Sequence, residues 1–252
     1  MSASFRLDGR CALVTGAAQG LGQGIAVALA EAGADVAGVD IVAIGETRAR
    51  VEAAGRRFAA IPQDLRGTAA AQLAVEEAAK ALGRLDILVN NAGIIRRADS
   101  IDFTEADWDA VIDVNLKSVF FLAQAAARRF MAQGGGGKIV NVASMLSFQG
   151  GIRVPSYTAS KSGVLGLTRL LANEWAPKGI NVNAIAPGYM ATANTAPLRA
   201  DAARSAEILG RIPAGRWGQP EDLAGAVVFL CSSAADYVHG TVIAVDGGWL
   251  AR

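Results

Sequence analysis

Three side chains near the middle of the chain have the types and spacing needed for acid–base chemistry. Ser144 follows the apolar run 139–143, Tyr157 comes thirteen residues later, and Lys161 lies four residues beyond it. Residues four apart on a helix share one face, so the phenol and the ammonium are expected side by side. A phenol titrates near ~10, too high for a general base at neutral pH, and a neighbouring ammonium lowers that value. The trio predicts a proton-transfer site, whereas the Tyr and Lys alone would also fit an amphipathic surface helix.

The elements around these residues place them at one edge of a sheet. The run 139–143 is typical of a buried parallel strand, so Ser144 lies at its carboxyl end. Glycines and a proline within 150–155 predict a loop. Ser156 is then expected to cap the N-terminus of a helix that continues to about Lys178.

A glycine-rich segment near the start of the chain predicts a nucleotide site. Residues 11–15 read as a short apolar strand, Gly16, Gly20 and Gly22 follow, and a helical pattern covers 25–32. Glycines at this spacing let the backbone approach a pyrophosphate, whose charge a helix N-terminus stabilises. The loop alone is a weak signal, but its strand–loop–helix context favours dinucleotide binding over an ordinary turn.

Asp40 ends the next strand pattern, 35–39, and favours NAD over NADP. A carboxylate there accepts hydrogen bonds from the ribose hydroxyls and repels a 2′-phosphate. Neither 17–19 nor 41–45 contains a Lys or Arg to receive such a phosphate. The alternative is a strand-end Asp that caps the following turn.

Two further strand ends are candidates for cofactor contacts. Asp64 follows the strand pattern 58–61 and could bind the adenine amino group, with an Asx turn as an equal alternative. The strand pattern 85–89 is followed by 90–93, Asn-Asn-Ala-Gly. Small and amide residues at this position suit packing near a bound ribose, in the crevice where open α/β sheets bind ligands.

Composition excludes several classes of function. Lys and Arg number 24 against 23 Asp and Glu, which argues against nucleic acid or an anionic membrane as partner. No apolar run approaches ~18 residues, and the N-terminus lacks a signal-peptide core. His239 is the single histidine and Cys11 and Cys231 are isolated, so metal clusters and Ser-His-Asp catalysis are not expected. A cytoplasmic, metal-independent protein is the simplest expectation.

Strand and helix patterns alternate along the chain. Further helices are expected at 46–55, 69–83 and 108–131, further strands at 180–186 and 241–245, and a helix that starts at Pro220. The segment 189–215 shows little periodicity apart from a charged helical piece, 198–209, and is expected to cover a ligand. The pattern predicts an α/β fold: one doubly wound parallel sheet in a single domain, 1–252.

These motifs resemble, in their order, those of the short-chain dehydrogenases/reductases. The resemblance covers nearly the whole chain and is carried by Thr15-Gly16-x-x-x-Gly20-x-Gly22, Asn90-Asn91-Ala92-Gly93, Asn115, Ser144, Tyr157-x-x-x-Lys161, Pro187-Gly188 and Asp246-Gly247-Gly248. It implies a seven-stranded Rossmann sheet, a nicotinamide cofactor and a catalytic tetrad of Asn115, Ser144, Tyr157 and Lys161.

The resemblance also implies how these residues act. Ser144 donates to the substrate oxygen, Tyr157 transfers its proton, and Lys161 lowers the tyrosine pKa and holds the nicotinamide ribose. The Asn115 main chain anchors a water that links Lys161 to solvent. The dinucleotide would contact Gly16, Gln19, Gly20, Leu21, Gly22, Asp40, Ile41, Asp64, Leu65, Asn91, Ala92, Gly93, Tyr157, Lys161, Pro187, Gly188, Met190 and Thr192.

Within the family, segments 145–155, 187–192 and 244–252 resemble enzymes that act on deoxy sugar acids. A substrate carboxylate is best bound by an arginine near the strand ends, because the planar guanidinium donates two parallel hydrogen bonds to the two carboxylate oxygens. Arg96 and Arg153 are both placed to reach the cleft, and each could instead be a solvated charge or an intersubunit pair. Gln149 could bind a substrate hydroxyl. The family also implies a homotetramer, with two-fold contacts through the long helices and the carboxyl terminus.

Three other functions remain open. A 3-oxoacyl thioester reductase would need a basic patch for an acidic carrier, for which Arg128 and Arg129 are weak candidates. A polyol dehydrogenase would use the same scaffold. A dinucleotide-sensing protein without turnover would have lost Tyr157 or Lys161, and both are present.

Overall fold

The computed structural model describes residues 4–252, and its strands form one parallel sheet. Strand order is β3-β2-β1-β4-β5-β6-β7. The chain adds strands on one side of β1 as far as β3 and then on its other side from β4 to β7, so the order reverses between β1 and β4. This arrangement confirms the predicted doubly wound α/β fold. The strands are β1 Cys11–Thr15, β2 Asp35–Asp40, β3 Phe58–Pro62, β4 Ile87–Asn90, β5 Gly137–Val142, β6 Ile180–Pro187 and β7 Val242–Val245.

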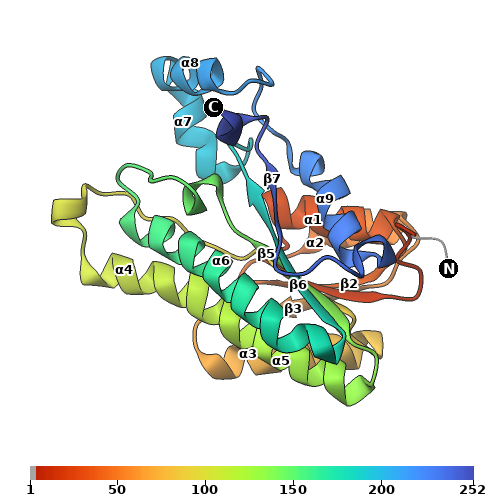
Figure 1. Ribbon diagram of the computed structural model, residues 1–252. Helices are drawn as coiled ribbons and strands as arrows, with labels where there is room; N and C mark the ends of the chain where they lie inside the picture. Colours follow the sequence, from red (N-terminus) through yellow and green to blue (C-terminus); the bar gives the residue numbers. More distant parts are fainter. Residues whose placement is uncertain (1–3) are drawn as a thin grey trace.

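Helices cover both faces of the sheet (Figure 1). One apolar cluster joins α3, α5 and α6 to the sheet, and a second joins α1, α2 and α9 to the other face. The helices are α1 Gly20–Glu31, α2 Gly45–Ala53, α3 Thr68–Leu82, α4 Glu105–Ile112, α5 Ser118–Gln133, α6 Pro155–Trp175, α7 Ala196–Ala200, α8 Ala202–Arg211 and α9 Ala224–Cys231.

Three local expectations are wrong. The helix predicted at 108–131 runs from α4 to α5 through a π-helical turn, η2 Asp113–Lys117. The helical piece 198–209 is two helices, because Asp201 is extended and caps α8 through the backbone N–H of Arg204. Ser156 is not the cap of α6: Pro155 occupies the first turn after Val154, and the Ser156 hydroxyl is buried without a partner within the described chain.

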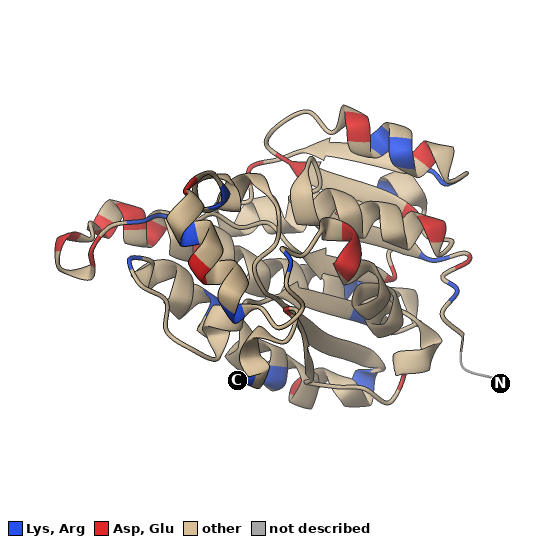
Figure 2. Cartoon of the chain, turned by 90° about the horizontal axis from the view of Figure 1, so that it is seen from above, with Lys and Arg blue, Asp and Glu red and all other residues tan. Residues whose placement is uncertain are grey.

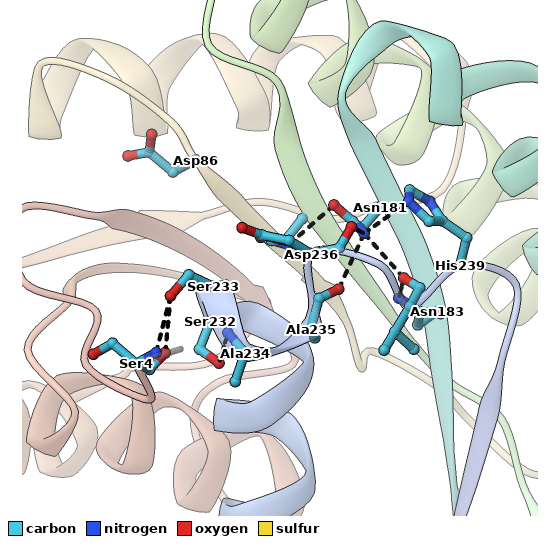
Figure 3. Close-up of polar contacts among 12 residues, drawn as sticks. Ser4, Asp86, Asn181, Asn183, Ser232, Ser233, Ala234, Ala235, Asp236 and His239 are labelled. Carbon is cyan, nitrogen blue, oxygen red and sulfur yellow. Dashed lines mark hydrogen bonds and ion pairs between the residues drawn. The ribbon is translucent and has the colours of Figure 1, made fainter. Parts of the chain in front are cut away.

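A polar network holds the amino ends of β5 and β6 to the segment before β7 (Figure 3). The Asn181 side-chain amide donates to the carbonyls of Asp236 and Val238, both at 3.0 Å, and its oxygen accepts from Lys138 Nζ at 3.0 Å. Lys138 also pairs with the Asp236 carboxylate at 2.6 Å. These contacts lie at the edge of the sheet opposite Ser144.

The helical stretch from α4 to α5, Glu105–Gln133, is long and apolar enough to cross a membrane by length and composition alone. Its apolar side chains Leu122, Ala126 and Phe130 are instead buried in the core cluster on the sheet. Charged residues lie mainly on the peripheral helices and loops (Figure 2). The stretch therefore has the burial of a core helix in an α/β domain.

Candidate active site

The structure brings the four predicted catalytic residues together beyond the carboxyl ends of β4 and β5. Ser144 follows β5 and is 7% exposed, while Tyr157 and Lys161 come from the first two turns of α6. Lys161 Nζ lies 5.7 Å from the centre of the Tyr157 ring and donates to the Val142 carbonyl at 2.6 Å. The one-turn spacing on α6 thus places a cation beside the phenol, as predicted.

The electrostatics of this pair differ from the expectation. In the chain alone, burial raises the pKa of Tyr157, while the Ser144 hydroxyl and the charge of Arg97 act in the opposite direction. Burial also lowers the pKa of Lys161 to about 8. The Lys161 ammonium is held by the Val142 carbonyl of β5 and lies over the phenol ring, so the predicted lowering of the tyrosine pKa by Lys161 stays a prediction.

Asn115 reaches the site through the π-helical turn η2. Its side chain is fully buried and pairs with the backbone of Ile94, accepting from the N–H at 2.8 Å and donating to the carbonyl at 2.9 Å. A side chain added at Gly93 would lie 3.3 Å from the Asn115 oxygen and 3.7 Å from Lys161 Nζ. Asn115 therefore fixes the loop after β4 against Lys161, and the extra residue of the π turn sits at a functional position.

The glycine loop forms a cradle that only glycine permits. Gly16 has φ +66°, and a Cβ on Gly22 would lie 1.9 Å from the Gly16 carbonyl oxygen. Asn91 Nδ2 donates to the Thr15 and Gly16 carbonyls at 2.9 and 3.2 Å, joining this loop to the end of β4. Helix α1 begins here without a side-chain cap, so its free N–H groups suit a pyrophosphate. The residues present fit a dinucleotide.

Asp40 lies at the end of β2, beside the glycine loop. Its carboxylate accepts from the backbone N–H of Ala18 at 2.9 Å and of Ile41 at 2.8 Å. The carboxylate thereby caps the turn after β2, the alternative that the sequence left open, and its contact with a ribose stays a prediction. Asp64, in contrast, is paired with Arg66 at 2.5 Å and accepts from its backbone N–H at 3.0 Å. This is the Asx turn that the sequence left as the alternative to adenine binding.

The remaining predicted cofactor positions line the same edge of the sheet. A Cβ on Gly188 would lie 2.6 Å from the Asp246 backbone, and a Cβ on Gly20 would touch the Thr192 side chain at 3.6 Å. Met190 is buried against Gly218. Thr192 therefore connects the glycine loop to the segment 189–215, whose helices α7 and α8 lie together at one end of the molecule (Figure 1). The contacts of Gln19, Leu21, Ile41, Leu65 and Pro187 with a dinucleotide stay predictions.

Among the arginines near the cleft, the two predicted from the sequence are paired within the chain. Arg96 Nε lies 3.3 Å from the Asp107 carboxylate, and Arg153 Nε lies 3.0 Å from that of Asp99. Arg153 adopts a left-handed backbone with φ +63°, a strained conformation for a side-chain-bearing residue. Gln149 is half-buried in the turn after Ser144, and its substrate contact stays a prediction.

Arg97 is the residue that the sequence analysis missed. Its charge is close enough to lower the pKa of the Tyr157 phenol. Its guanidinium donates to the Asn194 carbonyl at 3.2 Å, and it has no carboxylate partner among residues 4–252. The adjacent pair Arg96-Arg97 was the signal available in the sequence, but which of the two faces the phenol depends on the path of the loop.

The fold and site define a nicotinamide oxidoreductase of a known family. A family model described as enoyl-(acyl carrier protein) reductase matches residues 16–250. The chain belongs to the short-chain dehydrogenases/reductases and is a dehydrogenase that acts on CH–OH groups.

Several similar proteins carry more specific names. The chain is 64% identical over 249 residues to 2-dehydro-3-deoxy-D-gluconate 5-dehydrogenase of Escherichia coli (strain K12), covering 99% of this chain and 98% of the relative. A solved structure from Agrobacterium tumefaciens, provisionally named 2-deoxy-D-gluconate 3-dehydrogenase and with bound NADP, has 62% identity and a TM-score of 0.94, covering 98% of this chain and 99% of that one. A gluconate 5-dehydrogenase from Burkholderia cenocepacia J2315, in complex with NADP and tartrate, has 42% identity and a TM-score of 0.93, with 98% of each chain covered.

Proposed function

We propose that this enzyme transfers a hydride between NAD and a secondary alcohol or ketone of a deoxy sugar acid, 2-dehydro-3-deoxy-D-gluconate or 2-deoxy-D-gluconate. The observation that carries the proposal is Arg97, a guanidinium without a carboxylate partner in the described chain, whose charge lowers the pKa of the Tyr157 phenol. A planar guanidinium binds a carboxylate through two parallel hydrogen bonds. The names of the similar proteins point to the same class of substrate.

The tetrad then has separate tasks. Bound nicotinamide donates or accepts the hydride. Tyr157 gives the proton to the substrate oxygen or takes it away, while Ser144 donates a hydrogen bond to that oxygen. Lys161 lies beside the phenol, where its charge favours the phenolate, and Asn115 holds the loop that carries Gly93. Together these residues orient the reacting carbon and handle its proton.

Arg97→Ala tests the substrate class, with Arg96→Ala as the matched control. We expect Arg97→Ala to raise the KM for the sugar acid about tenfold or more, because the substrate carboxylate loses its charged partner. Turnover of a neutral diketone should change less than about twofold, and Arg96→Ala should leave both substrates near wild type. Equal losses on the acid and the diketone would remove Arg97 from the carboxylate role.

NAD is the proposed cofactor because of Asp40. Its carboxylate lies at the end of β2 beside the glycine loop, held by backbone N–H groups, and would repel a 2′-phosphate. The two solved relatives named above contain NADP, so the comparison of both dinucleotides is the decisive measurement. We expect a higher kcat/KM with NAD and a relaxed preference in Asp40→Ala. A higher kcat/KM with NADP in the wild type would overturn the assignment.

A panel of substrates separates this function from a 3-oxoacyl thioester reductase or a polyol dehydrogenase. Reduction of NAD should be measured with sugar acids, polyols and hydroxyacyl thioesters at equal concentrations. We expect the sugar acids to give the highest kcat/KM. Faster turnover of a thioester or a neutral polyol would contradict the proposed substrate.

We also propose that the enzyme is a cytoplasmic homotetramer. The first turn of α4 is acidic, with Glu105 and Asp107, whereas Arg128 and Arg129 lie near the end of α5. The elements α4, η2 and α5 form one continuous helical stretch, Glu105–Gln133. Antiparallel packing of this stretch against its copy in a second subunit brings the opposite charges together. Light scattering after size exclusion should give four times the mass of one chain, and a smaller assembly in Arg128→Glu/Arg129→Glu.

A further inference from the structure

The last residues of the chain pack against the segment that covers the site. After β7, the Asp246 carboxylate accepts from the backbone N–H groups of Gly248 and Leu250, both at 2.9 Å, and so fixes the final turn. The short helix η8 Trp249–Ala251 follows. Figure 1 shows the C-terminus beside α7 and α8, although more than thirty residues separate them in sequence. A Cβ on Gly248, whose φ is +87°, would lie 3.0 Å from the Pro213 ring.

Arg252 caps the carboxyl end of α8. Its Nη2 donates to the Gly210 carbonyl at 2.9 Å and its Nε to the Arg211 carbonyl at 3.3 Å. The last carbonyls of a helix have no partner inside the helix, and a cation there also interacts favourably with the helix dipole. A third bond runs from the Ala214 N–H to the Gly247 carbonyl at 3.0 Å. The end of α8 is therefore held by the end of the chain.

Trp249 connects this cap to the catalytic loop. Its side chain is 5% exposed, the Arg211 guanidinium lies 4.0 Å from its ring centre, and Tyr189 lies 4.9 Å away edge-on. The same buried cluster contains Ile208 of α8 and Met145, the residue after Ser144. The indole N–H is buried without a hydrogen-bond partner in the described residues. Such an unpaired donor lowers the stability of the fold, and the packing of the ring offsets that loss.

We infer that residues Trp249–Arg252 are a C-terminal latch, which holds α8 in place over the active site and so sets the affinity for the substrate. Trp249 and Arg252 are positioning residues: they act on the substrate through α8 and Met145. Removing the latch lowers the fraction of molecules with the segment in its binding position. Apparent affinity falls by the same factor, because only that fraction binds the substrate productively. The proton-transfer groups are untouched, so kcat changes little. The inference uses the proposed sugar acid only as the assay substrate.

Arg252→Ala is the direct test, with Arg6→Ala as its matched control. Arg6 also donates to a carbonyl at a helix end, that of Glu31, the last residue of α1, at 3.4 Å, but far from α8 in the fold. We expect Arg252→Ala to raise the KM for the sugar acid about fivefold to twentyfold, with kcat and the dinucleotide Kd within about twofold. Arg252→Lys should recover part of the loss, since an ammonium still reaches a carbonyl. Arg6→Ala should match wild type.

A second readout does not depend on turnover. Trypsin cleaves after arginine, and Arg199 and Arg204 lie in α7 and α8, so release of the latch should speed cleavage at these two sites in Arg252→Ala but not in Arg6→Ala. Trp249→Phe replaces the indole by a smaller phenyl group and so removes part of the packing against Ile208 and Met145, and it should raise the KM and speed cleavage in the same direction as Arg252→Ala.

The outcomes separate the two proposals. A wild-type enzyme that turns over no sugar acid would contradict the proposed function while the cleavage rates still test the latch. An Arg252→Ala variant with wild-type KM and cleavage rate would overturn the latch, even if the sugar acid is the substrate. Wild-type KM and cleavage rate in Trp249→Phe would remove the indole packing from the latch.

Discussion

Lys161 is a buried cation in the candidate active site. Its side chain is 4% exposed and has one hydrogen bond, to the Val142 carbonyl, and burial lowers its pKa from 10.5 to about 8. Keeping the ammonium charged in this site costs the folded state on the order of 3 kcal/mol below pH 8. Helix α6 thus places a cation beside the phenol at the cost of a lower free energy of unfolding. Such a loss is expected for a residue that is kept for catalysis.

Lys161→Met should therefore abolish turnover and stabilise the fold. The charge cost of about 3 kcal/mol is removed, while the lost hydrogen bond to Val142 offsets about 1 kcal/mol. The net gain of about 2 kcal/mol should be measured by urea unfolding at pH 7. Above pH 8 the folded wild type loses this proton before the unfolded chain does, so its own stability rises and the advantage of the variant shrinks toward pH 10. A gain that is independent of pH would contradict the assigned cost.

The pH profile of alcohol oxidation tests the electrostatic role of Arg97. This direction needs the Tyr157 phenolate as base, so the rate rises with pH through the tyrosine pKa. The charge of Arg97 lowers that pKa; Arg97→Ala should therefore shift the rising limb of kcat to higher pH, and ketone reduction should extend to higher pH as well. Arg96→Ala, whose guanidinium is paired with Asp107, is the control and should not shift either profile.

At the scale of elements, strands were more predictable than the irregular parts of helices. β1 begins and ends where the sequence placed it, because a continuous apolar run bounded by a glycine loop has few alternatives. The π turn at Asn115 has no local sign in the sequence: it depends on the pairing of Asn115 with Ile94, 21 residues away. Ser156 failed as a cap because Pro155, with its fixed φ, starts the helix itself.

The candidate site divides in the same way. Ser144, Tyr157, Lys161 and the glycine loop were predicted from spacing, since a strand end and one helical turn determine which side chains meet. The role of Asn115 came from the resemblance to the family. The substrate side was not predicted from spacing, because loops without periodicity decide it. Arg96 and Arg97 are adjacent in the sequence, and only the folded loop shows that one is paired with Asp107 while the other lies near Tyr157.

Gly22→Ala tests whether the glycine loop binds the dinucleotide. A methyl group would lie 1.9 Å from the Gly16 carbonyl oxygen, so the loop must open and the pyrophosphate loses backbone contacts. We expect the dinucleotide Kd, followed by fluorescence titration, to rise more than about tenfold. Gly45→Ala is the control: it also lies in the first turn of a helix, with open space around its Cβ position. An unchanged Kd in Gly22→Ala would contradict the assigned cradle.

Across the whole molecule, the two edges of the sheet have different tasks. The carboxyl edge carries Ser144, Asp40 and the segment 189–215, with partly unpaired groups such as the indole of Trp249. The amino edge carries satisfied polar networks, in which Asn181 joins Lys138 to the carbonyls before β7 (Figure 3). Because the strands are parallel, all the loops that carry chemistry meet at one edge, and the opposite edge is free to stabilise the fold.

Asn181→Ala should therefore change stability without changing catalysis. The variant leaves the carbonyls of Asp236 and Val238 without their side-chain donor and removes a partner of Lys138. We expect a loss of about 2 kcal/mol in the free energy of unfolding, measured by urea denaturation. The KM values and kcat should stay within about twofold of wild type below the unfolding temperature, because no contact of Asn181 reaches the catalytic edge. A change in kcat without a loss of stability would show that the two edges are coupled through β6.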